Sequence, residues 1–173
     1  AKAVNFGIVY GISAFSLSDD IGVSVAEAKA YMERYFATFP GVAAYQACVV
    51  EEAKEQGYVS TLMGRRRWLP ELKSSNFNLR SFGERVALNM PIQGTAADVI
   101  KLAMLKVRDA LKSEGLKARL ILQVHDELIV ECPEEETEQV RALLTREMEN
   151  VVSYAVPLRA EAGAGKNWGE AKG

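Results

Sequence analysis

The chain has little cysteine and almost no histidine. Its 173 residues include two cysteines, Cys48 and Cys132, and one histidine, His125. The cysteines lie far apart, no CxxC pair is present, and no histidine stands at ligand spacing from them. A zinc site and a disulfide framework are therefore not indicated, and the composition fits a reducing compartment.

Long apolar runs are missing as well. No stretch approaches the roughly 20 apolar residues that a membrane helix needs, and no secretory signal is present, so we expect a cytoplasmic protein without a membrane partner. The hydrophobic fraction of 49% and the charged fraction of 25% are typical of a globular domain. The net charge of -2 argues mildly against a nucleic-acid binder, although a catalytic metal site also needs acids.

A methionine, a cap residue and a turn signal are all absent before the first helical pattern, which starts at Ala1. We therefore expect the chain to be a piece of something longer. Glycines at Gly7 and Gly11 interrupt this first helical stretch over residues 1–20, and Ser24 with Glu27 forms a capping box for the next helix. Further helices are expected over 41–56, over 80–111 with an interruption near Pro91, and from Pro133 to about Val151.

Strand patterns are few. Residues 58–62 and 67–69 flank a basic turn and predict a small hairpin, residues 118–132 predict a second hairpin, and residues 156–162 read as a short strand. Long helices with few strands indicate an α+β fold, in which the helices pack on one face of a small antiparallel sheet.

The second hairpin contains three adjacent titratable residues, His125, Asp126 and Glu127, within an apolar run. A continuous strand would drive Asp126 into an apolar surface, whereas a turn at His125-Asp126 places both at an exposed tip at lower cost. Such a tip is either a plain surface turn or a rigid holder of carboxylate ligands for Mg²⁺.

Two polar or aromatic stripes follow from helical spacing. Lys2, Phe6 and Tyr10 are four residues apart, which suits a phosphate beside a sugar or base but is also typical of a core helix with a surface lysine. Arg85, Asn89 and Gln93 have the same spacing. They present donors suited to a duplex minor groove, or form a solvated polar face.

A third basic feature is the run Arg65–Arg67 in the expected turn. It either contacts phosphates or is simply solvated.

Taken together, these segments resemble the family A DNA polymerases. The resemblance rests on four motifs that occur in the family's order. Lys2–Gly11 resembles the fingers motif, Val124–Glu127 resembles the palm motif that carries a catalytic carboxylate, and Gly64–Arg67 and Asn89–Asp98 resemble further segments of the same region.

The resemblance implies a role for each candidate residue. Lys2 would bind the triphosphate of a dNTP, Phe6 would pack near its sugar and influence rejection of dideoxynucleotides, and Tyr10 would lie by the templating base. Asp126 would bind metal, with Glu127 as an accessory carboxylate. The remaining residues would contact primer-template DNA: His125 at the primer terminus, and Arg85, Asn89 and Gln93 along the minor groove.

The resemblance also implies DNA synthesis with two Mg²⁺ ions and a right-hand architecture, with residues 1–57 in the fingers and 58–173 in the palm. The family's first palm motif, its thumb, an exonuclease domain and a fingers arginine are absent from this sequence. We therefore expect a C-terminal fragment that needs the missing N-terminal portion and is inactive alone. The alternatives are a metal-dependent phosphodiesterase and a non-catalytic nucleic-acid binding module.

Overall fold

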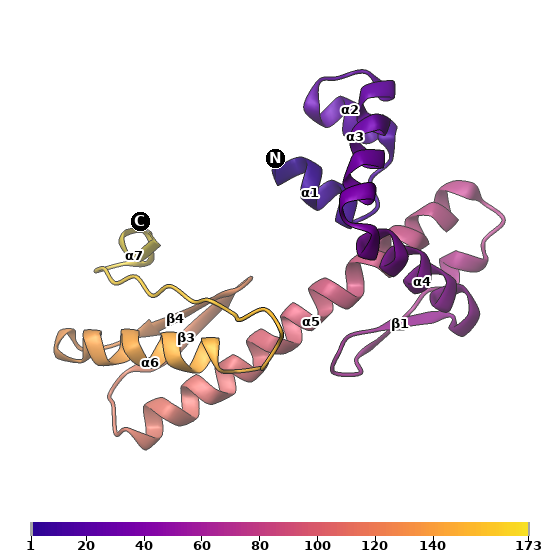
Figure 1. Ribbon diagram of the computed structural model, residues 1–173. Coiled ribbons are helices and arrows are strands. Elements are labelled where there is room, and N and C mark those ends of the chain that lie inside the picture. The colour runs from indigo at the N-terminus through magenta and orange to yellow at the C-terminus, as the bar shows by residue number, and fades with distance from the viewer. Residues whose placement is uncertain (1, 173) are drawn as a thin grey trace. The chain divides into compact units, whose positions relative to one another are not determined.

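The computed structural model describes the backbone of residues 2–172 and the side chains of residues 4–172. The chain divides into two compact units, Ala1–Thr95 and Ala96–Gly173, and the division falls inside the long helix α5 (Phe77–Ser113). Figure 1 shows the order of the elements.

The first unit is mainly helical. Its cores are two clusters of buried side chains, one under the first three helices and one between α4, the small hairpin and α5. Before α5 its elements are α1 (Lys2–Val9), α2 (Ala14–Ile21), α3 (Val25–Thr38), α4 (Pro40–Gln56), β1 (Tyr58–Ser60), β2 (Arg66–Trp68) and the 3₁₀ turn η1 (Pro70–Lys73).

The helical stretch expected over residues 1–20 is two helices separated by a turn at Gly11. Gly11 has a φ of +76°, which favours glycine. A Cβ on Gly11 would also lie 2.7 Å from Cδ1 of Leu88 on α5. Conformation and close approach together explain why the helix ends here, whereas α1 continues through Gly7.

The capping box at the start of α3 is confirmed. The Ser24 hydroxyl accepts the backbone N–H of Glu27, and the Glu27 carboxylate accepts the backbone N–H of Ser24. These two bonds satisfy donors that the first turn of a helix leaves free. The Ser24 hydroxyl also donates to Oε2 of Glu27 at 2.7 Å, and this bond, together with the one from the Ser24 backbone N–H, lowers the pKa of the Glu27 carboxyl by favouring its charged form.

The small hairpin with its basic turn is confirmed as well. Strands β1 and β2 pair antiparallel, with Tyr58 opposite Trp68. Arg65, Arg66 and Arg67 are all exposed, and the Arg66 guanidinium lies 4.6 Å from the centroid of the Tyr58 ring.

Pro91 does not interrupt α5, contrary to the expectation from sequence. The proline removes one backbone hydrogen bond, but the helix continues on both sides for 37 residues in all. Ala87 and Leu88, in the turn of α5 that precedes Pro91, are buried inside the first unit. This packing offsets the loss of one hydrogen bond.

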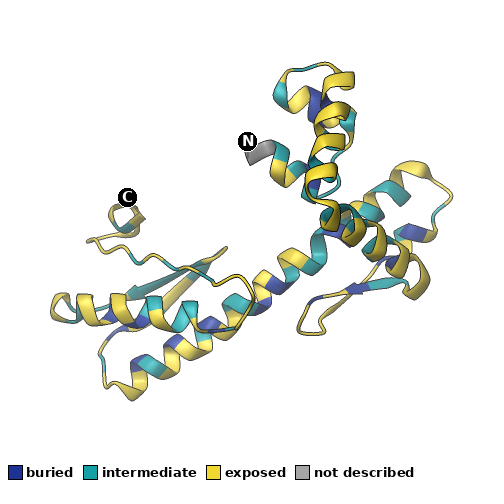
Figure 2. Ribbon diagram, viewed as in Figure 1, coloured by how far each residue is buried: buried dark blue, intermediate teal, exposed yellow. Residues whose placement is uncertain are grey.

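In the second unit, β3 (Arg119–Val124) pairs antiparallel with β4 (Glu127–Glu131), and the hairpin predicted over 118–132 is confirmed. The register shifts between Leu120 and Leu122, where the pairing is irregular. No residue of either strand is fully buried (Figure 2).

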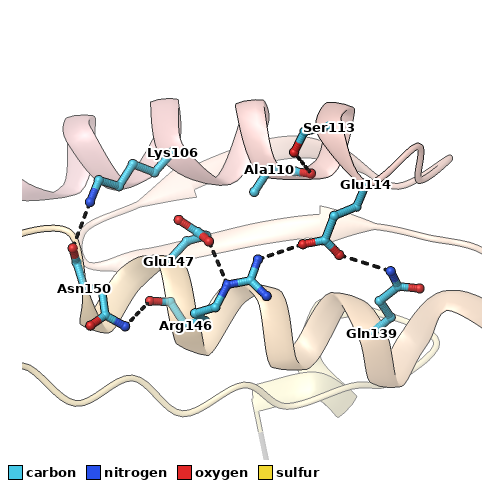
Figure 3. Close-up of polar contacts among 8 residues, drawn as sticks. All are labelled: Lys106, Ala110, Ser113, Glu114, Gln139, Arg146, Glu147 and Asn150. Atoms are coloured by element: carbon cyan, nitrogen blue, oxygen red, sulfur yellow. Dashed lines mark hydrogen bonds and ion pairs between the residues drawn. The ribbon is translucent and has the colours of Figure 1, made fainter.

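Helix α6 (Thr137–Glu149), which follows the 3₁₀ turn η2 (Glu134–Glu136), packs beside the last turns of α5. Val107, Leu111, Val140 and Leu143 form the buried cluster between them. Figure 3 shows the polar contacts at the same interface, where Arg146 lies between Glu147 and Glu114. Apolar packing and charge-assisted hydrogen bonds therefore hold α6 on α5.

The strand expected over 156–162 is wrong. This segment has no regular structure, because its backbone groups bind side chains of α6 instead of a neighbouring strand. The Ala160 N–H donates to Glu149 at 3.1 Å, and Arg141 donates to the Ala162 carbonyl at 3.0 Å. The chain then forms a short helix that the sequence analysis did not predict, α7 (Trp168–Lys172).

The α+β fold class is confirmed. The described residues contain two separate two-stranded antiparallel sheets among helices. Leu128 and Val130 of β4 pack on the cluster between α5 and α6, so helices cover one face of the second hairpin. Ile121 and Leu122 of β3 remain 57% and 45% exposed.

Candidate active site

Phe6 on α1 and Tyr10, directly after the end of this helix, come together. Their rings stack with centroids 6.1 Å apart and planes 25° from parallel, and Phe6 is 53% exposed. The backbone of Lys2 begins the same helix, while its side chain lies outside the described residues. The two aromatic residues of the expected stripe are therefore in contact, with Phe6 exposed and Tyr10 half-buried.

The position of α1 is fixed by α4. The side-chain amide of Gln46 donates to the carbonyls of Ile8 and Val9, at 2.7 and 3.1 Å, and so caps the end of α1. Ile8 is 1% exposed and anchors the opposite side of the helix. The aromatic pair thus projects from a helix that is held at its end and along its buried face.

The polar stripe on α5 lies in the same unit. Because Pro91 leaves the helix continuous, Arg85, Asn89 and Gln93 keep their four-residue spacing on one face. Arg85 and Gln93 are exposed, and Arg85 donates to the Ser81 hydroxyl at 3.0 Å. Oδ1 of Asn89 is buried, and no hydrogen-bond partner for it is present among the described residues.

An open groove of about 670 Å³ runs beside Arg85. Gly11, Gln46 and Leu88 line it, together with Lys54 and Glu84, whose charged groups lie 2.6 Å apart. The groove is bounded by α3, α4 and α5 and reaches the end of α1. It brings the C-terminal end of α1 and the start of the polar stripe to one surface of the first unit.

In the second unit, His125 and Asp126 form the turn between β3 and β4. This is the tip arrangement, not the continuous strand. His125 has a φ of 52°, unusual for a residue other than glycine, and its carbonyl accepts the side-chain amide of Gln123 at 2.7 Å. Both tip residues are exposed, so the Asp126 carboxylate is open to solvent.

Glu127, the first residue of β4, has two partners that the sequence analysis missed. Nζ of Lys172 lies 2.7 Å from its Oε1, and Nε1 of Trp168 donates to its Oε2 at 3.2 Å. The Lys172 hydrogen bond lowers the pKa of the Glu127 carboxyl, Trp168 adds to this effect, and nearby His125 contributes least. No local sequence pattern links these two residues to Glu127, which precedes Trp168 by 41 residues.

The tip carries oxygen donors of the kind that Mg²⁺ binds. Exposed carboxylate oxygens are the ligands that Mg²⁺ prefers, and Asp126 offers them. The described residues contain no group of three or more histidine, cysteine, aspartate or glutamate side chains that could hold a metal ion. The donor set fits one or two protein ligands of a magnesium site, with further ligands needed from elsewhere.

Comparison with protein families matches residues 1–170 to the family described as DNA polymerase family A. The chain belongs to this family. Family A membership confirms the resemblance stated from the four sequence motifs. None of the described helices is long and apolar enough to cross a membrane.

Similar proteins include DNA polymerase I of Bacillus subtilis, which is 55% identical over 172 residues, and that of Bacillus caldotenax, which is 54% identical over the same length. In both cases the match covers 99% of this chain and 20% of the relative. The chain therefore spans about one fifth of the length of these family A relatives.

A solved structure is also similar, the POL domain of Pol1 from M. smegmatis in complex with DNA primer-template and dNTP. The TM-score is 0.95 at 47% sequence identity, and the match covers 99% of this chain and 30% of that one.

Proposed function

We propose that this chain is the fragment of a DNA polymerase I that carries part of its fingers and palm, and that the intact enzyme performs template-directed DNA synthesis. In that reaction the primer 3'-hydroxyl attacks the α-phosphate of a dNTP and releases pyrophosphate. The observation that carries the proposal is the exposed Asp126 at the tip of the β3–β4 hairpin, in a chain that belongs to family A.

The first unit would bind the incoming nucleotide. Lys2 would hold the triphosphate, Phe6 would pack against the sugar, and Tyr10 would lie beside the templating base. The exposed ring of Phe6, stacked on a half-buried Tyr10, supports this assignment, since a ligand can reach Phe6 without unfolding the helix.

Primer-template DNA would contact residues of both units. Arg85, Asn89 and Gln93 carry side-chain donors, and minor-groove acceptors occur at every Watson–Crick pair, so these contacts would test pair geometry without reading sequence. His125 would touch the primer terminus. The exposure of Arg85, Gln93 and His125 supports these roles.

Asp126 would hold magnesium, with Glu127 as an accessory carboxylate. When bound, two Mg²⁺ ions would stabilise the attacking and leaving oxygens of an in-line displacement. The chain's own residues then bind and orient the reactants. Because the tip offers too few ligands for two ions, we propose that the isolated chain is inactive without the remaining, N-terminal portion of the polymerase.

The region assignments are part of the same proposal, with residues 1–57 in the fingers, residues 58–173 in the palm, and the intact enzyme in the cytoplasm. Mixing the isolated chain with the remaining portion of the polymerase tests the inactivity. Primer extension is expected only in the mixture, and magnesium-dependent extension by the chain alone would contradict it.

Replacing Asp126 by asparagine in the intact polymerase tests the main proposal. We expect the single-turnover rate of nucleotide incorporation to fall by roughly 10³-fold, while primer-template affinity stays within about twofold, because the contacts to DNA remain. Asp20→Asn, at an exposed position of α2, is the matched control. An unchanged rate would favour a non-catalytic binding module, and hydrolysis of phosphodiesters that is lost in Asp126→Asn would favour a phosphodiesterase.

A further inference from the structure

The C-terminal helix α7 contacts the residue next to the proposed metal-binding aspartate. Lys172 and Trp168 each donate to a different oxygen of the Glu127 carboxylate. The two donors and their acceptor are 41 or more residues apart in sequence but lie within the same unit. Neither oxygen of Glu127 is left without a donor.

The two donors are arranged as a pair. Trp168 and Lys172 are four residues apart on α7, and the ammonium group lies 5.9 Å from the centroid of the indole ring. Rotation of the Glu127 carboxylate about its last bond would break at least one of the two contacts. The pair therefore restricts the orientation of Glu127 as well as its position.

The start of α7 is fixed by its own hydrogen bonds. Oδ1 of Asn167 accepts the backbone N–H of Glu170 at 3.0 Å, and the Glu170 carboxylate accepts from the Asn167 amide and from the backbone N–H of Lys166. This reciprocal arrangement follows the logic of a capping box. It holds the helix at the end opposite Lys172.

The preceding loop also approaches α7 closely. A Cβ on Gly165 would lie 2.6 Å from Cβ of Glu170, and a Cβ on Gly163 would collide with the Ala171 carbonyl oxygen. Only glycine allows the backbone to lie this near the helix. Cap and loop together make α7 a fixed support for Trp168 and Lys172.

We propose that Trp168 and Lys172 are positioning residues for the polymerase reaction, which clamp Glu127 beside Asp126; the inference rests on the proposed function. The clamp holds an accessory carboxylate in one orientation and balances its charge. Asp126 thereby keeps an ordered neighbour when it binds metal. Mutation of a side chain that orients a metal ligand through a hydrogen bond commonly lowers metal affinity or activity by about 10- to 100-fold.

The test uses two variants of the intact polymerase. Lys172→Met removes the ammonium donor and keeps an unbranched apolar side chain, and Trp168→Phe removes the indole N–H and keeps an aromatic ring. We expect each to lower the single-turnover incorporation rate, by about 10-fold for Lys172→Met, and to raise the Mg²⁺ concentration needed for half-maximal rate. Lys172→Arg should restore most of the rate. Lys166→Met, an exposed lysine six residues earlier, is the matched control.

A double-mutant cycle with Glu127→Ala separates clamping from a direct contact between Lys172 and DNA. If the lysine acts through Glu127, Lys172→Met will not lower the incorporation rate further in the Glu127→Ala background. Slow rates in that background can be followed over hours with excess enzyme. An equal loss in both backgrounds, accompanied by weaker primer-template binding, would overturn the clamp in favour of a DNA contact.

Unchanged rates and an unchanged magnesium requirement in Lys172→Met and Trp168→Phe would also overturn the clamp. This result is distinguishable from failure of the proposed function, because Asp126→Asn would still lower the incorporation rate by roughly 10³-fold. Thermal unfolding of each variant checks that the rate changes do not arise from loss of the fold.

Discussion

Phe6 on α1 and Tyr10, the first residue after this helix, have their rings stacked at a centroid separation of 6.1 Å. Tyr10 is the more buried of the two, and the ring of Phe6 is 53% exposed. The stack packs one face of the Phe6 ring against Tyr10, while about half of the residue stays exposed. A hydroxyl added to this ring would therefore be carried by a side chain whose orientation is restricted.

Phe6→Tyr should therefore increase acceptance of dideoxynucleotides by the intact enzyme. A tyrosine hydroxyl would replace a hydrogen bond that the missing 3'-hydroxyl cannot make, and one such bond is equivalent to roughly 10-fold in rate. Chain termination at a fixed ratio of dideoxynucleotide to dNTP measures the change. Phe15→Tyr, on exposed Phe15 of α2, is the control, and equal termination by Phe6→Tyr and the parent enzyme would refute the prediction.

Gln93→Ala should weaken binding of primer-template DNA to a similar extent for every terminal base pair. Its side chain offers a donor to acceptors common to all pairs, so the loss is one hydrogen bond of about 1 kcal/mol, or roughly fivefold in Kd. Titration with four primer termini that differ in the last pair measures it. Gln56→Ala, at the exposed end of α4, is the control, and a loss confined to one sequence would contradict the minor-groove role.

Glu114→Gln should destabilise the chain in a pH-dependent way. Arg146 donates to Oε1 of Glu114 at 2.7 Å and Gln139 to Oε2 at 3.0 Å, and these bonds lower the pKa of the carboxyl below its ordinary value of 4.5. The stabilisation is therefore complete above pH 4.5 and is lost as pH falls through the lowered value.

Urea unfolding of the parent chain and of Glu114→Gln at a series of pH values measures this effect. The difference in unfolding free energy should be constant from pH 7 to about pH 5 and shrink below that range. Glu135→Gln, at an exposed position of η2, is the control. A difference that grows on acidification would have the wrong sign.

Gly94→Ala should destabilise the first unit, although alanine favours helices. A Cβ at position 94 would lie 2.7 Å from Cγ2 of Thr61 and 3.3 Å from Cε of Met90, and overpacking of this kind costs about 1 to 3 kcal/mol. Thr61→Ser removes the methyl group and keeps the hydroxyl that accepts from Met63 and Arg65.

In the Thr61→Ser background the sign should reverse. With the closest contact removed, the gain in helix propensity of about 1 kcal/mol dominates. Chemical unfolding of the single and double variants provides the comparison. If Gly94→Ala destabilises equally in both backgrounds, the Thr61 methyl is not the cause.

Local signals in the sequence predicted the local structure well. The Ser24–Glu27 capping box and the turn at His125-Asp126 depend on residues within a few positions of one another, and both are present. The prediction of a strand over 156–162 was wrong because an extended apolar pattern does not show whether a neighbouring strand is available for pairing. Instead, the backbone of this segment forms hydrogen bonds with side chains of α6.

The clamp on Glu127 was not predictable for a related reason. Trp168 and Glu127 are 41 residues apart, and no local pattern links them. The prediction of an interruption at Pro91 was wrong because the packing of neighbouring turns can offset the hydrogen bond that a proline removes from a helix. Long-range packing decided both outcomes, and a single sequence does not display it.

Position 125 combines a left-handed backbone conformation with an imidazole side chain. The φ of 52° is accessible to glycine, and to asparagine and aspartate at a modest cost, while β-branched residues are strongly disfavoured. Only histidine among the tolerated residues adds an imidazole. A glycine at position 125 would therefore keep the shape of the turn and delete the imidazole, so the backbone geometry of the tip and its side-chain chemistry can be inherited, lost or engineered independently.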